Sequence, residues 1–172
     1  MKTGKLVVVL PNLDENHRQR IRDAASGHGL EVCFFDHVRD SLSALAEADA
    51  LILSLPGTPE TFHLLGEAQL ALLPDGAAVI NVGRGSVIDQ PALERELRSG
   101  RLCAALDVFE EEPLPQDHSL WTCPNLLITP HVAGNMTLPW TVNRIVELFL
   151  EDLENYCNGK PLRRRIDPQR GY

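Results

Sequence analysis

Short apolar runs alternate with amphipathic segments along the whole chain. The runs are short and mostly unbroken, as expected of strands that are buried on both faces of a parallel sheet. They lie at residues 6–10, 31–35, 50–55, 77–82, 102–106 and 126–128. The segments between them carry helical spacing or helix-capping residues, at 12–26, 41–48, 67–73, 89–98 and 137–159. This alternation predicts an α/β fold with a doubly wound, mainly parallel sheet in a three-layer α/β/α arrangement.

Polar residues at the edges of the amphipathic segments predict where the helices begin. Asn12, followed by Glu15, has the pattern of a capping box, and Asp89 and Thr137 are expected to cap two later helices. Glycines such as Gly27 and Gly100 follow the last apolar position of a segment and predict its end. No linker-like stretch interrupts the pattern, so we expect a single domain over residues 1–172.

Four of the apolar runs end in residues that are suited to chemistry. The runs stop before Pro56, before the turn Gly83-Arg84-Gly85, before Asp107, and before Pro130-His131. In an open parallel sheet, ligands bind beyond the carboxyl ends of the strands. A guanidinium, a carboxylate and an imidazole at successive strand ends therefore predict a functional site at that edge.

Composition narrows the classes of partner. The formal net charge of −8 argues against nucleic acid or an anionic membrane surface as the main partner. No apolar run approaches the roughly 18 residues that a membrane span requires. The four cysteines are widely spaced and form no C-x-x-C pair, which favours a reduced, cytoplasmic protein without a metal site.

Several ordered motifs resemble those of the D-isomer-specific 2-hydroxyacid dehydrogenases. They are SLPGTPET, NVGRGSVIDQPAL, ALDVFEEEPLP, HSLW and NLLITPHVAG, followed by a similar tail, NGKPLRRRID. The resemblance is dense from about residue 51 onward, and it implies a Rossmann-like coenzyme domain at 51–160 and a tail at 161–172. Residues 1–50 form an atypical N-terminal segment that resembles the start of the family's substrate domain.

The resemblance implies that Arg84, Glu112 and His131 carry the reaction. Arg84 would bind the carboxylate and carbonyl oxygen of a 2-oxo acid, because a planar fork of donors matches a carboxylate. His131 would exchange a proton with the carbonyl oxygen, and Glu112 would hold the imidazole in one tautomer. Each residue also has a structural interpretation: a surface turn for Arg84, a solvated acidic loop for Glu112 and a structural histidine for His131.

The resemblance also implies NAD or NADP as cofactor and assigns residues to it. Pro56, Thr58 and Thr61 would pass the adenosine half, whereas the remaining residues would lie on the nicotinamide side. This second group consists of Val82, Gly83, Asp107 and Gly134. For Asp107, a helix or turn cap is the structural alternative.

The chain departs from the family at the glycine-rich phosphate loop, which it lacks. The first strand is followed by Pro11-Asn12-Leu13-Asp14-Glu15, which places two carboxylates where two phosphates should lie. Asp36 closes the second run, where a ribose-binding acid is expected, although an ordinary strand-end acid is the alternative. We hypothesise that residues 6–55 complete one sheet without restoring phosphate binding.

Together these patterns predict an oxidoreductase that transfers hydride between NAD(P)H and a small 2-oxo acid such as glyoxylate or hydroxypyruvate. The resemblance implies small 2-oxo and 2-hydroxy acids as substrates, and it allows a homodimer. The alternative is a catalytically impaired relative that acts as an oligomer partner or a weak nucleotide-binding module. A flavodoxin-like binding module fits the topology but leaves the three residues Arg84, Glu112 and His131 unexplained.

Overall fold

The computed structural model describes residues 4–9, 13–35, 44–134 and 138–166. The chain divides into two compact units, Met1–Pro130 and His131–Tyr172, and each is described by itself. The single-domain organisation expected from the sequence stays a prediction.

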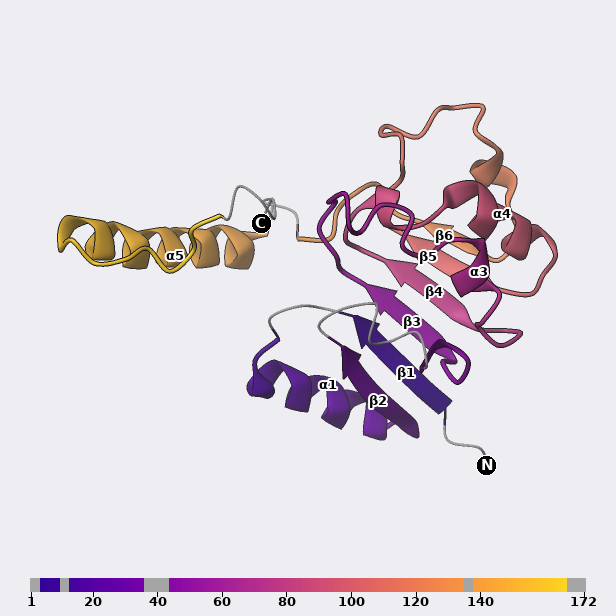
Figure 1. The fold of residues 1–172 in the computed structure, drawn as a ribbon, viewed down its shortest axis with the longest axis horizontal. Helices are drawn as coiled ribbons and strands as arrows, with labels where there is room; N and C mark the ends of the chain where they lie inside the picture. The colour runs from indigo at the N-terminus through magenta and orange to yellow at the C-terminus, as the bar shows by residue number, and fades with distance from the viewer. Residues whose placement is uncertain (1–3, 10–12, 36–43, 135–137, 167–172) are drawn as a thin grey trace. The chain divides into compact units, whose positions relative to one another are not determined.

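Within the described residues of the first unit, six parallel strands form one sheet (Figure 1). Their order across the sheet is β2-β1-β3-β4-β5-β6. The strands are β1 (Gly4–Val9), β2 (Leu30–Phe35), β3 (Ala50–Leu53), β4 (Ala78–Asn81), β5 (Cys103–Leu106) and β6 (Leu126–Ile128). The predicted doubly wound α/β fold is therefore confirmed, and the sheet is entirely parallel.

The N-terminal segment is part of the same sheet as the later strands. Val9 of β1 lies beside Phe35 on one side and Leu53 on the other. Leu53 in turn pairs with Asn81 of β4. This confirms the hypothesis that residues 6–55 complete one sheet, and the apolar sequence of β1 explains it, because Val7 and Val9 are fully buried.

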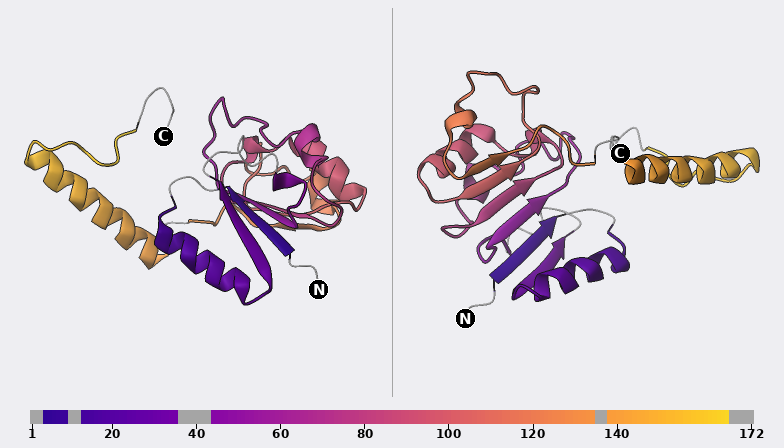
Figure 2. Two further views of the ribbon diagram at one scale, coloured as in Figure 1. Left: turned by 60° about the horizontal axis from the view of Figure 1, so that its bottom comes forward. Right: turned by 180° about the vertical axis from the view of Figure 1, so that it is seen from behind.

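The sheet is flanked by the helices α1 (Glu15–Ser26), α3 (Glu67–Leu70) and α4 (Gln90–Arg98), all within the described part of this unit. The chain crosses from β1 to β2 in one direction and from β3 through β6 in the other, so right-handed crossovers place α1 on one face and α3 and α4 on the opposite face (Figures 1 and 2). The other predicted helix, at 41–48, lies partly outside the described residues.

One predicted cap is correct and one is wrong. Asp89 caps α4, since its carboxylate accepts the amide of Ala92. The cap of α1 is Asp14 rather than Asn12, because the Asp14 side chain accepts the amide of His17 and the helix begins at Glu15. Asn12 itself and Asp36 lie outside the described residues.

The main core lies between the sheet and the layer of α3 and α4. Alternate residues of the strands, such as Leu51, Val79 and Leu106, are buried on this side, as the period of two requires. They form one cluster with Leu93 and Leu97 of α4. The core therefore fixes the strand ends from which the polar loops emerge.

The second unit contains a long helix, α5 (Pro139–Cys157), and the tail that follows it. Its N-cap is Leu138, without a side-chain cap, and the predicted cap Thr137 lies outside the described residues. The helix therefore begins with Pro139 in its first turn, where the missing amide proton of proline costs nothing.

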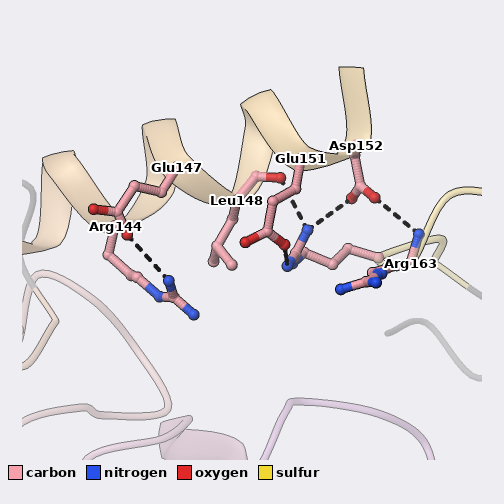
Figure 3. Close-up of polar contacts among 7 residues, drawn as sticks. Arg144, Glu147, Leu148, Glu151, Asp152 and Arg163 are labelled. Carbon is pink, nitrogen blue, oxygen red and sulfur yellow. Dashed lines mark hydrogen bonds and ion pairs between the residues drawn. The ribbon is translucent and has the colours of Figure 1, made fainter. Parts of the chain in front are cut away.

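The tail folds back along α5 and is held by two acidic residues of the helix (Figure 3). The Arg163 amide donates to Asp152 Oδ1 at 2.8 Å, and the Arg164 guanidinium binds Glu151, Asp152 and the carbonyl oxygen of Leu148. The Arg163 amide lowers the pKa of Asp152, and the Arg164 guanidinium lowers the pKa of Glu151.

Among the described residues, no helix combines the length and the hydropathy that a bilayer crossing requires.

The lowered pKa values of Glu151 and Asp152 predict that acid releases the tail from α5. Stabilisation of the tail is complete above the ordinary carboxyl pKa values of 3.8 and 4.5, and is lost as the pH falls through the lowered values. At neutral pH, Asp152→Asn should speed hydrogen exchange of the Arg163 amide about 2- to 10-fold, because a charged acceptor becomes neutral. NMR exchange rates measure this.

The matched control is Glu147→Gln, which removes a carboxylate of the same helix that pairs with Arg144 and not with the tail. Equal exchange rates of the Arg163 amide in both variants would contradict the assignment.

Candidate functional site

The turn that carries Arg84 is held from beneath by the side chain of Asn81. Asn81 is the last residue of β4 and is 1% exposed. Its Oδ1 accepts the Gly83 amide at 3.1 Å, and its Nδ2 donates to the Arg84 carbonyl oxygen at 2.9 Å. One buried amide therefore satisfies both ends of the turn. Asn81 is a positioning residue that the sequence reasoning missed, although a polar residue inside an apolar run was a readable signal.

Two glycines allow this turn to pass between neighbouring loops. A β-carbon at Gly83 would lie 2.5 Å from the backbone nitrogen of Leu55, in the loop after β3. A β-carbon at Gly85 would lie 1.9 Å from the carbonyl carbon of Phe109, in the loop after β5. Both positions exclude any side chain, so the observed role of Gly83 is close packing of the backbone. Its assignment to the cofactor stays a prediction.

Arg84 extends from this turn at the carboxyl end of β4. Its backbone is extended, and its Nη1 donates to the Gly83 carbonyl oxygen at 2.8 Å. A β-carbon at Gly57 would lie 3.3 Å from Arg84 Cγ, so the arginine stem lies against the loop after β3. Among the described residues, Arg84 forms no ion pair, and its side chain is exposed. Its guanidinium therefore keeps N–H donors that can bind an anion.

The loop after β3 is stabilised by the two threonines predicted to contact the cofactor. Thr61 Oγ1 accepts the Thr58 amide at 2.9 Å and donates to the Pro56 carbonyl oxygen at 2.7 Å. The loop is then joined to the segment after β4, since the His63 amide donates to the Ser86 carbonyl oxygen. Pro56, Thr58 and Thr61 thus build the loop, and any contact with a cofactor stays a prediction.

Asp107 is a buried carboxylate at the carboxyl end of β5. It is 4% exposed and accepts a hydrogen bond from the Thr129 hydroxyl, which follows β6. Asp107 therefore joins the ends of two neighbouring strands. Val82, which follows β4, is 37% exposed, and its amide donates to the Leu53 carbonyl oxygen.

Two glutamates of the loop after β5 have distinct partners. Glu112 Oε1 accepts the Phe109 amide at 2.9 Å, so this carboxylate closes its own loop. Glu110 Oε1 lies 2.9 Å from His63 Nε2 and accepts the first amide of α4, from Gln90. His63 therefore ties the loops after β3 and β5 together.

His131 and Gly134 belong to the second unit. His131 follows β6 by three residues and has a φ of 51°, and Gly134 has a φ of 73°. The first unit gathers Arg84, the loop at 56–61, Asp107 and Glu112 at the carboxyl ends of adjacent parallel strands. The convergence of His131 with Arg84 and Glu112 stays a prediction.

A parallel sheet whose order reverses between β1 and β3 is the architecture of a doubly wound α/β domain of the Rossmann kind. Comparison with known proteins defines the family. Residues 20–133 match the model of the D-isomer specific 2-hydroxyacid dehydrogenase NAD binding domain. The chain belongs to the D-isomer-specific 2-hydroxyacid dehydrogenase family.

Individual relatives agree with this. The chain is 41% identical over 126 residues to a glyoxylate/hydroxypyruvate reductase B of Yersinia pestis, which covers 73% of this chain. A D-isomer specific 2-hydroxyacid dehydrogenase of Xanthobacter autotrophicus, solved with NADPH, matches 98% of this chain and 73% of its own with a TM-score of 0.81 and 33% identity. An NADPH-dependent glyoxylate/hydroxypyruvate reductase of Sinorhizobium meliloti matches 99% of this chain and 57% of its own at a TM-score of 0.79 and 27% identity. The match spans only 38% of the length of the curated Yersinia relative.

The described residues fit the nicotinamide side of such a dinucleotide and do not fit its pyrophosphate. The exposed guanidinium of Arg84 follows β4, and the carboxylate of Asp107 follows β5, which is the neighbouring strand. At α1 the His17 amide is used internally, because the Asp14 carboxylate accepts it, and Glu15 adds a second carboxylate in the first turn. The described residues at this position therefore do not fit a pyrophosphate.

We predict that Gly85→Ala destabilises the first unit by about 3 kcal/mol or more, since the added methyl group meets backbone atoms that cannot rotate away. The free energy of unfolding from urea titration measures the loss.

Gly27→Ala is the matched control, because its β-carbon would lie 3.5 Å from the nearest atom and its φ is −60°. That variant should keep its stability or gain up to about 1 kcal/mol. A Gly85→Ala chain as stable as the control would show that the three loops do not pack as described.

Proposed function

We propose that this chain is an NAD(P)-dependent oxidoreductase that interconverts a small 2-oxo acid, of the glyoxylate or hydroxypyruvate kind, and its 2-hydroxy acid. The observation that carries the proposal is Arg84, an exposed guanidinium without an ion-pair partner among the described residues, held at a strand end by Asn81. The family supports the same chemistry, since the named relatives include glyoxylate/hydroxypyruvate reductases.

Arg84 binds the carboxylate and the carbonyl oxygen of the substrate. A planar guanidinium presents parallel N–H donors, which fix the acid in one orientation and polarise the carbonyl group. The Arg84 backbone is anchored through Asn81 and its stem lies against Gly57, so little side-chain freedom is lost when the acid binds.

His131 donates a proton to the carbonyl oxygen as it becomes a hydroxyl, and takes it back in the reverse direction. Glu112 orients and stabilises the protonated imidazole. A bound reduced nicotinamide supplies the hydride. The 2-oxo acid gains one hydride and one proton, so charge and atoms balance in the 2-hydroxy acid.

The alternative function, a catalytically impaired relative that binds nucleotide weakly, is favoured by a specific observation. The capped N-terminus of α1 offers a phosphate no free amide at His17. Turnover of glyoxylate with NADH or NADPH by the purified chain decides between the two functions.

A reducing, cytoplasmic location and a homodimer complete the proposal. All four cysteines lie among the described residues and are free, which supports a reducing compartment. In α5 no residue is buried, and an apolar stripe at helical spacing is exposed. The stripe consists of Val142, Ile145, Val146, Phe149, Leu153 and Tyr156. Such a stripe supports association with a second copy.

Arg84→Lys is expected to lower kcat/KM for glyoxylate about 10- to 100-fold, mainly through KM, because one bidentate contact is lost. His131→Ala is expected to lower kcat about 100- to 10,000-fold, since the proton donor is lost. The decrease in absorbance of the reduced nicotinamide, as NADH or NADPH is oxidised, measures both rates.

Arg95→Lys is the matched control, since Arg95 pairs with Glu67 on an exposed surface. This variant should keep the kinetics of the parent chain. If Arg84→Lys behaves like Arg95→Lys, then Arg84 does not bind the substrate carboxylate.

For the homodimer, the double substitution Ile145→Glu and Phe149→Glu should convert the dimer to a monomer, because two charges would be buried in an apolar contact. Light scattering after size-exclusion chromatography measures the mass. Asn143→Glu, which adds one charge beside the stripe, should leave the dimer intact. A monomeric parent chain would refute this part of the proposal.

A further inference from the structure

We infer that this chain excludes the pyrophosphate of a dinucleotide and holds a nicotinamide nucleoside only through the loops after β4 and β5. The inference rests on the proposed function and deepens it, since it names the part of the cofactor that the chain recognises. Asp14 and Glu15 are the residues that set this specificity.

The position of these residues follows from the strand order. The chain runs from β1 to β2 in one direction, then returns to place β3 on the other side of β1. Such a reversal creates the crevice in which doubly wound domains bind ligands, and the helix after the first strand points its N-terminus at it. In this chain that helix is α1.

The N-terminus of α1 is occupied by its own side chains. Asp14 Oδ1 accepts the His17 amide at 2.8 Å and lies 3.0 Å from His17 Nδ1. Glu15 adds a second carboxylate in the first turn. An Asp at this position occupies the site that a phosphate oxygen would take, and both carboxylates repel an anion.

The sequence before α1 also lacks the residue type that close approach of a diphosphate needs. No glycine occurs between Val9 and Glu15, whereas close approach needs residues without side chains. The Leu13 carbonyl oxygen accepts a hydrogen bond from Arg18 Nε at 3.1 Å, so this segment is tied to the helix.

Two of the three arginines of α1 are directed to partners other than a phosphate. Arg22 Nη1 donates to Glu15 Oε1, and its guanidinium carbon lies 5.2 Å from the centre of the Phe34 ring. Arg18 lies over the same ring at 5.5 Å. Both cations are therefore engaged by partners on α1 and β2.

The loops on the other side of the reversal are built differently. The loop after β3 is closed by Thr61 and joined to Ser86, and Gly57 lies against Arg84. The N-terminus of α1 thus carries two carboxylates, whereas the ends of β4 and β5 present the exposed guanidinium of Arg84 and the buried carboxylate of Asp107. Binding energy for a nucleotide should therefore come from the nicotinamide side alone.

Isothermal titration calorimetry with three ligands tests this directly in the full chain. The ligands are NADH, reduced nicotinamide riboside, which lacks the two phosphates and the adenosine, and ADP-ribose, which lacks the nicotinamide. We expect NADH to bind no tighter than the riboside, and ADP-ribose neither to bind nor to displace NADH. NADH binding more than about tenfold tighter than the riboside, a difference of about 1.4 kcal/mol, would overturn the inference.

A double variant, Asp14→Ser with Glu15→Gln, tests the two residues named. Serine keeps the cap of α1 without the charge, so the helix should persist by circular dichroism. The association constants of ADP-ribose and NADH should rise about 3- to 30-fold, while that of the riboside stays unchanged. The matched control is Glu67→Gln, which removes a first-turn carboxylate of α3 that is likewise paired with an arginine.

The outcomes separate this inference from the proposed function. Failure of the riboside to bind, together with no turnover of glyoxylate, would refute the proposed function. The exclusion of pyrophosphate would then be judged by ADP-ribose alone. Tight binding of ADP-ribose to the parent chain, or no gain in the double variant, would overturn the inference and leave the proposed function standing.

Discussion

The arrangement of the candidate site depends on three backbone segments that meet at distances too short for a β-carbon. Gly83 packs against Leu55 and Gly85 packs against Phe109, and Arg84 lies between these two contacts. Asn81 then satisfies both polar ends of the turn from below. The backbone amide and carbonyl groups of these loops need hydrogen-bond partners within the protein when they are buried. Dense packing of the three loops brings such partners within reach. The position of the Arg84 side chain is therefore set by the backbone of the turn that carries it.

The strand order of the sheet reverses between β1 and β3, and the loops on the two sides of this reversal carry groups of opposite charge. On the β3–β5 side, loops are joined to one another and leave a cation available. On the β1 side, the helix that would receive phosphates satisfies its own N-terminus with Asp14. A helix dipole favours any nearby negative charge, whether it comes from a ligand or from the chain. In this protein the Asp14 side chain supplies that charge, which stabilises α1 and is the basis of the inferred exclusion of phosphate.

Much of the fold and part of the site could be predicted from the sequence. The six strands were located by their short apolar runs, and Asp89 was correctly placed as a cap because its contact lies only three residues away. Asn12 was the wrong cap for α1, since the helix begins at Glu15 and the Asp14 carboxylate accepts the His17 amide. Asn81 was missed as a positioning residue although its contacts lie only two and three residues away, because they stabilise a turn after a strand and follow no helix-capping pattern.

By itself, the sequence determined the alternation of strands and helices, the family, and the order in which Arg84, Asp107 and Glu112 follow the strands. These features depend on neighbouring residues, whose periodicity and capping are local. Only the tertiary structure decided that β1 lies between β2 and β3 and that Gly83 and Gly85 are wedged between loops. It also decided that Glu110 and His63 meet across 47 positions of sequence. Such contacts join residues far apart in the chain, so their free energy appears only when the whole sheet has formed.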